Sequence, residues 1–299
     1  MLLKDRPLLI FITLAFAFCW FWAGIISVSH IDYGSMASTL IVALGCMSAP
    51  ALAAFIVARF VLKQPLKMLA VNWKTANRGI IFTTALWLAV WAASFYLFMW
   101  LGSMAFGEEL FGRVDFSHEG LLNRIEDLTQ GQFDPESFNI PSVPVVLSLI
   151  LISAVIAGAT INLIFALGEE IGWRGFMYSR LEHLPAYRRI IFTGVIWGFW
   201  HAPLILQGHN YPANPEWGVF MMVVFCVALA FPMDWLRRNS NSVLAPAAFH
   251  GMINASAAGL MMFVYPGHEF LGSVVGLAGI LALGPVYLVQ SAISRPSGG

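Results

Sequence analysis

Residues 143–170 read VPVVLSLILISAVIAGATINLIFALGEE. The part over 143–168 has no charged side chain and is followed at once by two glutamates. At about 1.5 Å per residue, a helix of this length crosses the hydrocarbon core of a bilayer, which needs about 20 apolar residues. Carboxylates at the end of such a helix are costly to desolvate and point to a function. The stretch therefore predicts a membrane-spanning helix that carries a polar site.

The composition of the whole chain is that of a membrane protein. Apolar residues make up 59% of the 299 and charged residues only 11%, which excludes an ordinary soluble domain. We therefore expect an all-α polytopic bundle of about eight transmembrane helices, forming a single integral membrane domain over residues 1–299. The eight apolar stretches long enough to be spans are approximately 7–29, 37–62, 79–106, 143–168, 190–207, 217–236, 242–264 and 271–292.

Charge and cysteine usage narrow the classes of partner. The formal net charge is zero, so no strong general attraction to nucleic acid is expected. Cys19, Cys46 and Cys226 all lie inside apolar runs, where a thiol behaves as a small apolar group, and no disulfide framework is implied. The expected partners are the lipid bilayer and whatever binds the polar site.

Basic residues predict the orientation, because Lys and Arg are retained on the cytoplasmic side of a membrane. Only Arg113 and Arg124, in an acidic loop of about residues 107–142, fall outside if both termini are cytoplasmic. The other 14 of the 16 basic residues then lie inside: Lys4, Arg6, Arg59, Lys63, Lys67, Lys74, Arg78, Arg174, Arg180, Arg188, Arg189, Arg237, Arg238 and Arg295. We therefore expect both termini in the cytoplasm.

The first polar cluster contains Glu169, Glu170 and Arg174. Adjacent positions on a helix differ by about 100°, so the two carboxylates face different neighbours. Glu170 and Arg174 are four residues apart, the spacing at which a carboxylate and a guanidinium pair on one helix face. We expect Arg174 to hold Glu170 as an ion, which leaves Glu169 free to act as a general base. The alternative is a glutamate pair that only caps the span.

Two histidines in later spans lie at a depth comparable to that of the glutamates. His201 stands in an aromatic run with Pro203 behind it, and His250 lies about eight residues into the stretch 242–264. Asn254 is one turn beyond His250 on the same helix face, where its amide can donate a hydrogen bond to an oxyanion. Each of these residues alone is more often a packing residue. Together with the carboxylates they predict a shared polar cavity.

A glutamate and two histidines suit two hydrolytic mechanisms. In one, Glu169 and His201 polarise a water that attacks a peptide carbonyl, while His250 and Asn254 stabilise the oxyanion. In the other, Glu169, His201 and His250 bind Zn²⁺, whose bound water becomes the nucleophile. The zinc-protease motif His-Glu-x-x-His is absent, so spacing does not decide between them. A serine nucleophile is not expected, because no Gly-x-Ser-x-Gly elbow occurs.

In this order the motifs resemble those of the type II CAAX prenyl endopeptidase family, also called CPBP intramembrane proteases. The resemblance rests on Glu169-Glu170-x-x-x-Arg174, on an aromatic residue four positions before His201, and on His250-x-x-x-Asn254. It implies a helical bundle around a conical cavity open to the cytoplasm, with a catalytic core within residues 143–264. The implied site residues are Glu169, Glu170, Arg174, His201, His250 and Asn254. At the aromatic position this chain has Trp197, where the family usually has Phe.

The resemblance also sets expectations for substrate and location. It implies an intramembrane endopeptidase of the bacterial plasma membrane that acts on a peptide or protein, with a lipidated substrate as one option. Zinc dependence and oligomeric state stay open. One alternative is a non-proteolytic protein of the same fold that acts in bacteriocin self-immunity or as a scaffold. Another is a transporter with a Glu/His proton relay, which would favour paired half-structures that the sequence does not show.

Overall fold

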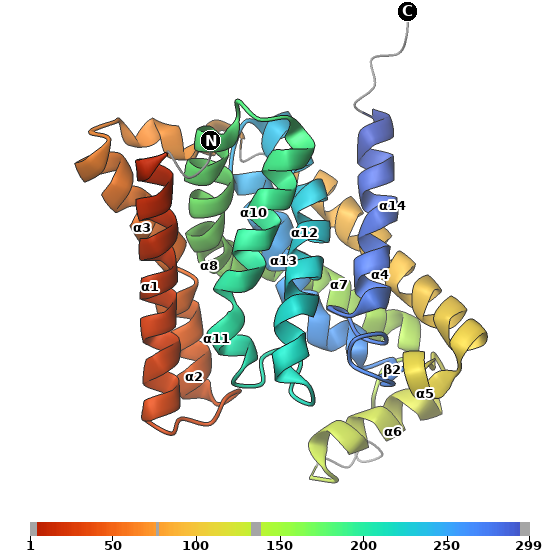
Figure 1. Cartoon of the computed structure of the whole chain (residues 1–299). Coiled ribbons are helices and arrows are strands. Elements are labelled where there is room, and N and C mark those ends of the chain that lie inside the picture. Colours follow the sequence, from red (N-terminus) through yellow and green to blue (C-terminus); the bar gives the residue numbers. More distant parts are fainter. Residues whose placement is uncertain (1–4, 76–77, 133–138, 294–299) are drawn as a thin grey trace, which may run out of the picture.

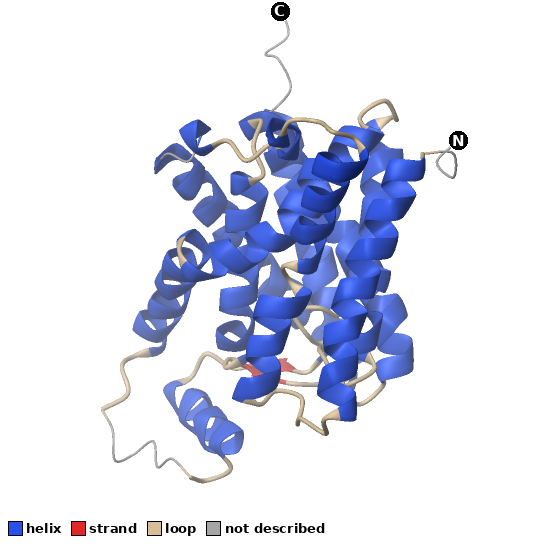
Figure 2. Ribbon diagram, turned by 90° about the vertical axis from the view of Figure 1, so that its left-hand side faces the viewer, coloured by secondary structure: helices blue, strands red, loops and turns tan. Residues whose placement is uncertain are grey.

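The computed structural model describes residues 5–75, 78–132 and 139–293, which are mostly helical (Figures 1 and 2). Lys4 and Arg295, which entered the predicted orientation, lie outside these ranges. The α-helices are α1 (Arg6–Val28), α2 (Met36–Ile41), α3 (Ala49–Ile56), α4 (Arg78–Phe106), α5 (Glu108–Phe111), α6 (His118–Thr129), α7 (Val143–Ala159), α8 (Ile161–Glu170), α9 (Tyr178–Leu181), α10 (Ala186–Trp200), α11 (Ala202–Ile205), α12 (Pro215–Ser240), α13 (Leu244–Met261) and α14 (Leu277–Ile293). The π-helical segments are η2 (Val42–Cys46), η3 (Val57–Val61) and η7 (Ile171–Met177), and the 3₁₀ turns are η4 (Leu66–Leu69) and η5 (Trp73–Thr75).

The chain is a polytopic helical membrane protein. Four helical segments of the described residues are long and apolar enough to cross a bilayer, and a bent pair of helices makes a fifth. These segments are Arg6–Val28, Met36–Val61, Phe82–Phe106 and Pro215–Ser240, with the pair Val143–Ala159 and Ile161–Leu181. Helices occupy the other three predicted stretches as well, but α10 has only 15 residues and α14 only 17. Five of the eight predicted stretches thus hold segments that are long and apolar enough to span by themselves, with the bent pair taken as one span.

The stretch 143–168, predicted as one straight span, is broken at Thr160. The two helices on either side meet at 56°, and Thr160 itself has φ −130° and ψ −100°. Helix α13 passes close to the break: a Cβ added at Gly158 would lie 2.6 Å from the backbone nitrogen of Met252. Just after the break, Asn162 Nδ2 donates a hydrogen bond to the Gly251 carbonyl at 3.2 Å. The bend thus lets α8 run beside α13.

Helices α10 and α12 pack closely through two glycines. A Cβ added at Gly194 would lie 2.5 Å from the Val227 Cα, and one at Gly198 would clash with Val223 in the same way. Small residues at this spacing let two backbones approach within a membrane. The contact sets the end of α10, and with it His201, against the middle of α12.

Helix α1 begins and α14 ends at the same end of the bundle (Figure 1). We call the opposite end the distal end, and it carries α6 and the loops before α2, after α11 and before α14. Two short strands tie this end together: β1 (Arg113–Val114) pairs antiparallel with β2 (Val264–Tyr265). The sequence did not predict these strands, because each has only two residues and no alternating pattern to detect.

Candidate active site

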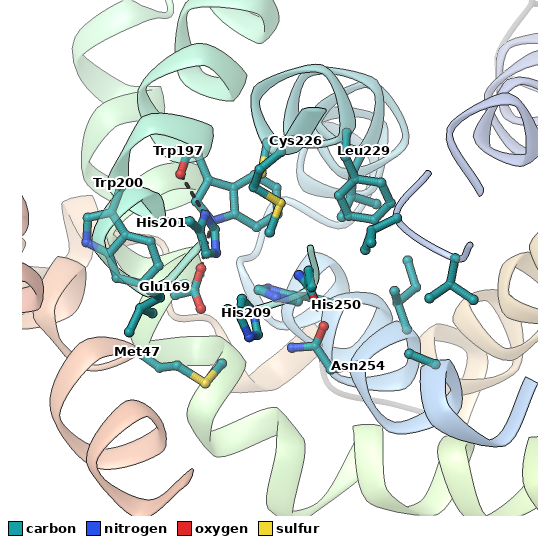
Figure 3. A pocket seen from close by; sticks show the side chains of 18 of the residues that line it. Met47, Glu169, Trp197, Trp200, His201, His209, Cys226, Leu229, His250 and Asn254 are labelled. Atoms are coloured by element: carbon teal, nitrogen blue, oxygen red, sulfur yellow. Dashed lines mark hydrogen bonds between the residues drawn. The ribbon is translucent and has the colours of Figure 1, made fainter. Parts of the chain in front are cut away.

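A cavity of about 290 Å³ lies among α8, α10, α12 and α13 (Figure 3). Four of the predicted site residues line it: Glu169, His201, His250 and Asn254. Glu170 and Arg174 lie behind the wall, where the Glu170 side chain is fully buried and the Arg174 side chain is 3% exposed. The structure thus brings together the polar residues of three separate helices, as the sequence predicted.

Glu170 links Arg174 to His250. Arg174 Nη1 lies 3.1 Å from Glu170 Oε2, which confirms the pair expected from the four-residue spacing. The other carboxylate oxygen, Glu170 Oε1, accepts a hydrogen bond from His250 Nδ1 at 3.0 Å. Because Nδ1 is engaged, the Nε2 nitrogen of His250 is the one left for chemistry. Glu170 therefore orients the histidine of a different helix, a contact that sequence spacing alone did not reveal.

Glu169 has a partner that the sequence analysis missed. The indole Nε1 of Trp197 donates a hydrogen bond to Glu169 Oε2 at 2.7 Å, a short distance typical of a charge-assisted bond. The Arg174 guanidinium lies 4.4 Å from the centroid of the same indole ring. The sequence identified Trp197 only as the aromatic residue four positions before His201. The signal was present in the residue type, since Trp carries a donor that Phe lacks.

His201 is held by the last turn of its own helix. Its Nδ1 lies 2.9 Å from the Trp197 carbonyl oxygen, which can only accept, so Nδ1 carries the proton and Nε2 is free (Figure 3). Helix α10 ends at Trp200 and α11 begins at Ala202, with Pro203 in its first turn. The side chain of Trp200 packs edge-on against the imidazole, with ring centroids 4.7 Å apart. The tautomer and the ring position are thus both fixed.

Asn254 lies one turn beyond His250 on α13 and lines the cavity. It is exposed, and its amide makes no hydrogen bond with any other described residue. Figure 3 shows the amide beside the His250 ring on the same side of the cavity. An unengaged donor at this position is available to a ligand.

A third histidine of the cavity, His209, was not predicted as a site residue. It comes from the loop after α11 and projects toward the other labelled polar groups (Figure 3). The residues on either side of it, Gly208 and Asn210, both have positive φ, of 97° and 62°. A Gly-His-Asn triplet just after a proline-broken helix is the sequence signal that could have found it, because glycine and asparagine are the residues that adopt such a turn most easily.

Comparison with known proteins finds a match in the same part of the chain that holds the cavity residues. Residues 144–256 match the model of the family described as Type II CAAX prenyl endopeptidase Rce1-like. This part of the chain is similar to that family. The matched region contains all six predicted site residues, from Glu169 to Asn254.

The chain is also similar to a curated protein, the CAAX prenyl protease 2 of Methanococcus maripaludis. The two are 27% identical over 98 residues. That alignment spans 31% of this chain and 36% of the relative. The matching part is therefore only about a third of the relative's length.

The cavity extends toward the distal end of the bundle. Its lining reaches the exposed Asn210 in the loop after α11, and Val274 and Val275 in the loop before α14 (Figure 1). Among the described lining residues, none comes from a loop at the end where α1 begins. The lining thus reaches loops at the end opposite to the one where α1 begins.

The predicted zinc ligands meet one requirement for a metal site and fail another. His201 and His250 each hold one ring nitrogen on an oxygen, as metal-bound histidines usually do. However, no three His, Cys, Asp or Glu side chains of the described residues lie close enough together to hold an ion. As arranged, Glu169, His201 and His250 do not form a metal site.

Proposed function

We propose that this chain is an intramembrane endopeptidase in which Glu169 and His201 activate a water molecule. The observation that carries the proposal is that Glu169, His201, His250 and Asn254, from three helices, line one cavity. Hydrogen bonds to Trp197 and Glu170 fix three of these side chains. The match to a family named for endopeptidase activity supports the same conclusion.

In the first step, the water lies between the Glu169 carboxylate and Nε2 of His201. The imidazole nitrogen accepts one hydrogen bond from the water and orients it, while Glu169 takes the other proton as general base. The water oxygen bonds to the peptide carbonyl carbon, and the carbonyl oxygen becomes an oxyanion. The carboxylate is prepared for this role because its second oxygen is already held by Trp197.

The oxyanion is stabilised from the opposite wall. The Asn254 amide donates to it, and Nε2 of His250 donates as well when the ring is an imidazolium, which the Glu170 carboxylate on Nδ1 stabilises. When the intermediate breaks down, Glu169 passes its proton to the departing amine nitrogen as the C–N bond breaks. Glu169 returns to its carboxylate form and the acyl product leaves as a carboxylic acid.

The substrate is a peptide or protein reached from the bilayer or its surface, and lipidated substrates remain one option. The zinc-dependent mechanism stays an alternative, because substrate binding can bring side chains closer together than they are in the free cavity. Elemental analysis of purified protein, with the alanine variants of His201 and His250 beside it, decides between the two. Stoichiometric zinc that both variants lose would favour the metal.

The assay that tests the proposal is cleavage of a membrane-presented peptide library by the purified chain. Glu182 and His183 offer matched controls, because both are exposed in the turn before α10 and far from the cavity along α10. Glu182→Gln and His183→Ala remove the same chemical groups as the site variants do. They are expected to cleave at the parent rate.

A further inference from the structure

The loop that carries His209 is shaped to turn this side chain into the protein. Gly208 and Asn210 take positive φ on either side of it, and the amide nitrogens of His209 and Tyr211 bond to the carbonyls of Leu204 and His209 at 3.1 and 2.7 Å. The imidazole packs edge-on against Tyr33, with ring centroids 5.7 Å apart. Among the described residues, no hydrogen bond holds either ring nitrogen. The imidazole is therefore positioned without being chemically engaged.

His209 lies at the junction of two hollows. It lines the catalytic cavity and also a second hollow of about 310 Å³, which we call the groove. The two share His209, Val42 and Met47. The other residues of the groove are Tyr33, Gly34, Ser38, Thr39 and Ala43. The groove is therefore continuous with the site and opens beside the loop before α2, at the distal end.

The groove is uncharged and mostly apolar, with a few polar groups in its wall. Within the described residues, the hydroxyls of Tyr33 and Thr39 make no hydrogen bond, while the Ser38 hydroxyl donates to the Ser35 carbonyl at 3.0 Å and accepts from Ser35 Oγ at 3.3 Å. Burial lowers the pKa of His209 to about 4, so its imidazole is neutral near pH 7 and can both donate and accept. An extended peptide offers backbone N–H and C=O groups that match such partners.

We propose that the groove, with His209 at its inner end, binds the uncharged, extended segment of the substrate on one side of the scissile bond. The inference rests on the proposed function, because it requires a peptide in the catalytic cavity. Small side chains suit the segment, since the groove volume is near the lower end of the range for ligand sites, about 300 to 1,000 Å³. Charged side chains are disfavoured because no charged group of the groove would compensate their desolvation.

Photocrosslinking tests the groove independently of cleavage. The crosslinker p-benzoylphenylalanine is placed at Thr39 in the full chain with Glu169→Gln, which keeps any bound peptide intact. Position 40 is the matched control, because Leu40 is exposed on the same helix and does not line the groove. The probes are two liposome-anchored peptide libraries, one of small uncharged residues and one with aspartates added. We expect crosslinks at position 39 with the uncharged library, fewer with the acidic one, and few at position 40.

A second readout uses the parent enzyme and its substrate. His209→Ala removes one hydrogen-bonding partner and should raise KM by about 2- to 12-fold with kcat unchanged, the range expected for one hydrogen bond. His183→Ala should leave both constants unchanged. Equal crosslinking at positions 39 and 40, or a loss in kcat alone for His209→Ala, would overturn the groove assignment even if the parent cleaves. If peptides crosslink at position 39 but the parent enzyme cleaves no peptide, the proposed function is refuted instead.

Discussion

Replacing Trp197 with Phe removes one hydrogen bond from Glu169 and keeps an aromatic ring in the cavity wall. The bond that disappears joins Trp197 Nε1 to Glu169 Oε2 at 2.7 Å. Both side chains are about 2% exposed, so water does not readily replace the lost donor. A hydrogen bond to a charged group contributes about 1.5 to 3 kcal/mol, which corresponds to about a 10- to 150-fold change in rate. We expect kcat to fall by this factor with KM nearly unchanged.

The assay is steady-state cleavage by purified protein, with thermal unfolding followed in parallel. Trp20→Phe is the matched control, because Trp20 Nε1 donates to the Trp200 carbonyl at 3.3 Å and the side chain does not line the cavity. The control should change stability more than kcat. If Trp197→Phe keeps the parent kcat, the indole does not position the carboxylate and the reasoning is refuted. That result would match the usual Phe at this position of the family.

Three further predictions follow from the site and its surroundings. Asn254→Ala should lower kcat by about 10²- to 10³-fold, the usual cost of one oxyanion donor, and a smaller effect in the cleavage assay would remove Asn254 from this role. His209 has a pKa below its ordinary 6.5, so the unfolded chain binds its proton first and stability should fall as the pH drops from about 6.5 toward 4. The free energy of unfolding, measured by denaturation in detergent, should fall by about 1 to 2 kcal/mol between pH 8 and pH 5. This fall should be absent in His209→Gln. Cysteine labelling from outside should reach positions near Asp127 and not near Lys67, and the reverse pattern would place the termini outside.

The fold was predictable where it depends on apolar length and not where it depends on packing. The long apolar run of α12 identified a span directly, and the structure confirms it. The break at Thr160 was not visible, because the run 143–168 is uniformly apolar and the bend depends on contacts of Gly158 and Asn162 with α13. The same limit explains why α10 and α14 are shorter than their predicted stretches, since composition does not show where a helix ends.

The site was predictable where motif spacing fixes a contact. Glu170 and Arg174 pair as their four-residue spacing indicated, and the cavity gathers the histidines expected there. The bonds between helices were missed, because spacing along one chain does not report which side chain of another helix lies opposite. For this reason the sequence revealed neither the role of Trp197 nor the place of His209 in the cavity.

The measurement that tests the central claim most directly is cleavage of the peptide library by Glu169→Gln and His201→Ala. Removing a general base or the group that orients the water should lower turnover by about 10²- to 10⁴-fold, while each variant stays monodisperse and inserted in the membrane. The matched controls Glu182→Gln and His183→Ala should retain the parent rate. If both site variants cleave at the parent rate, water activation by Glu169 and His201 is wrong, and a non-proteolytic role of the same fold takes its place.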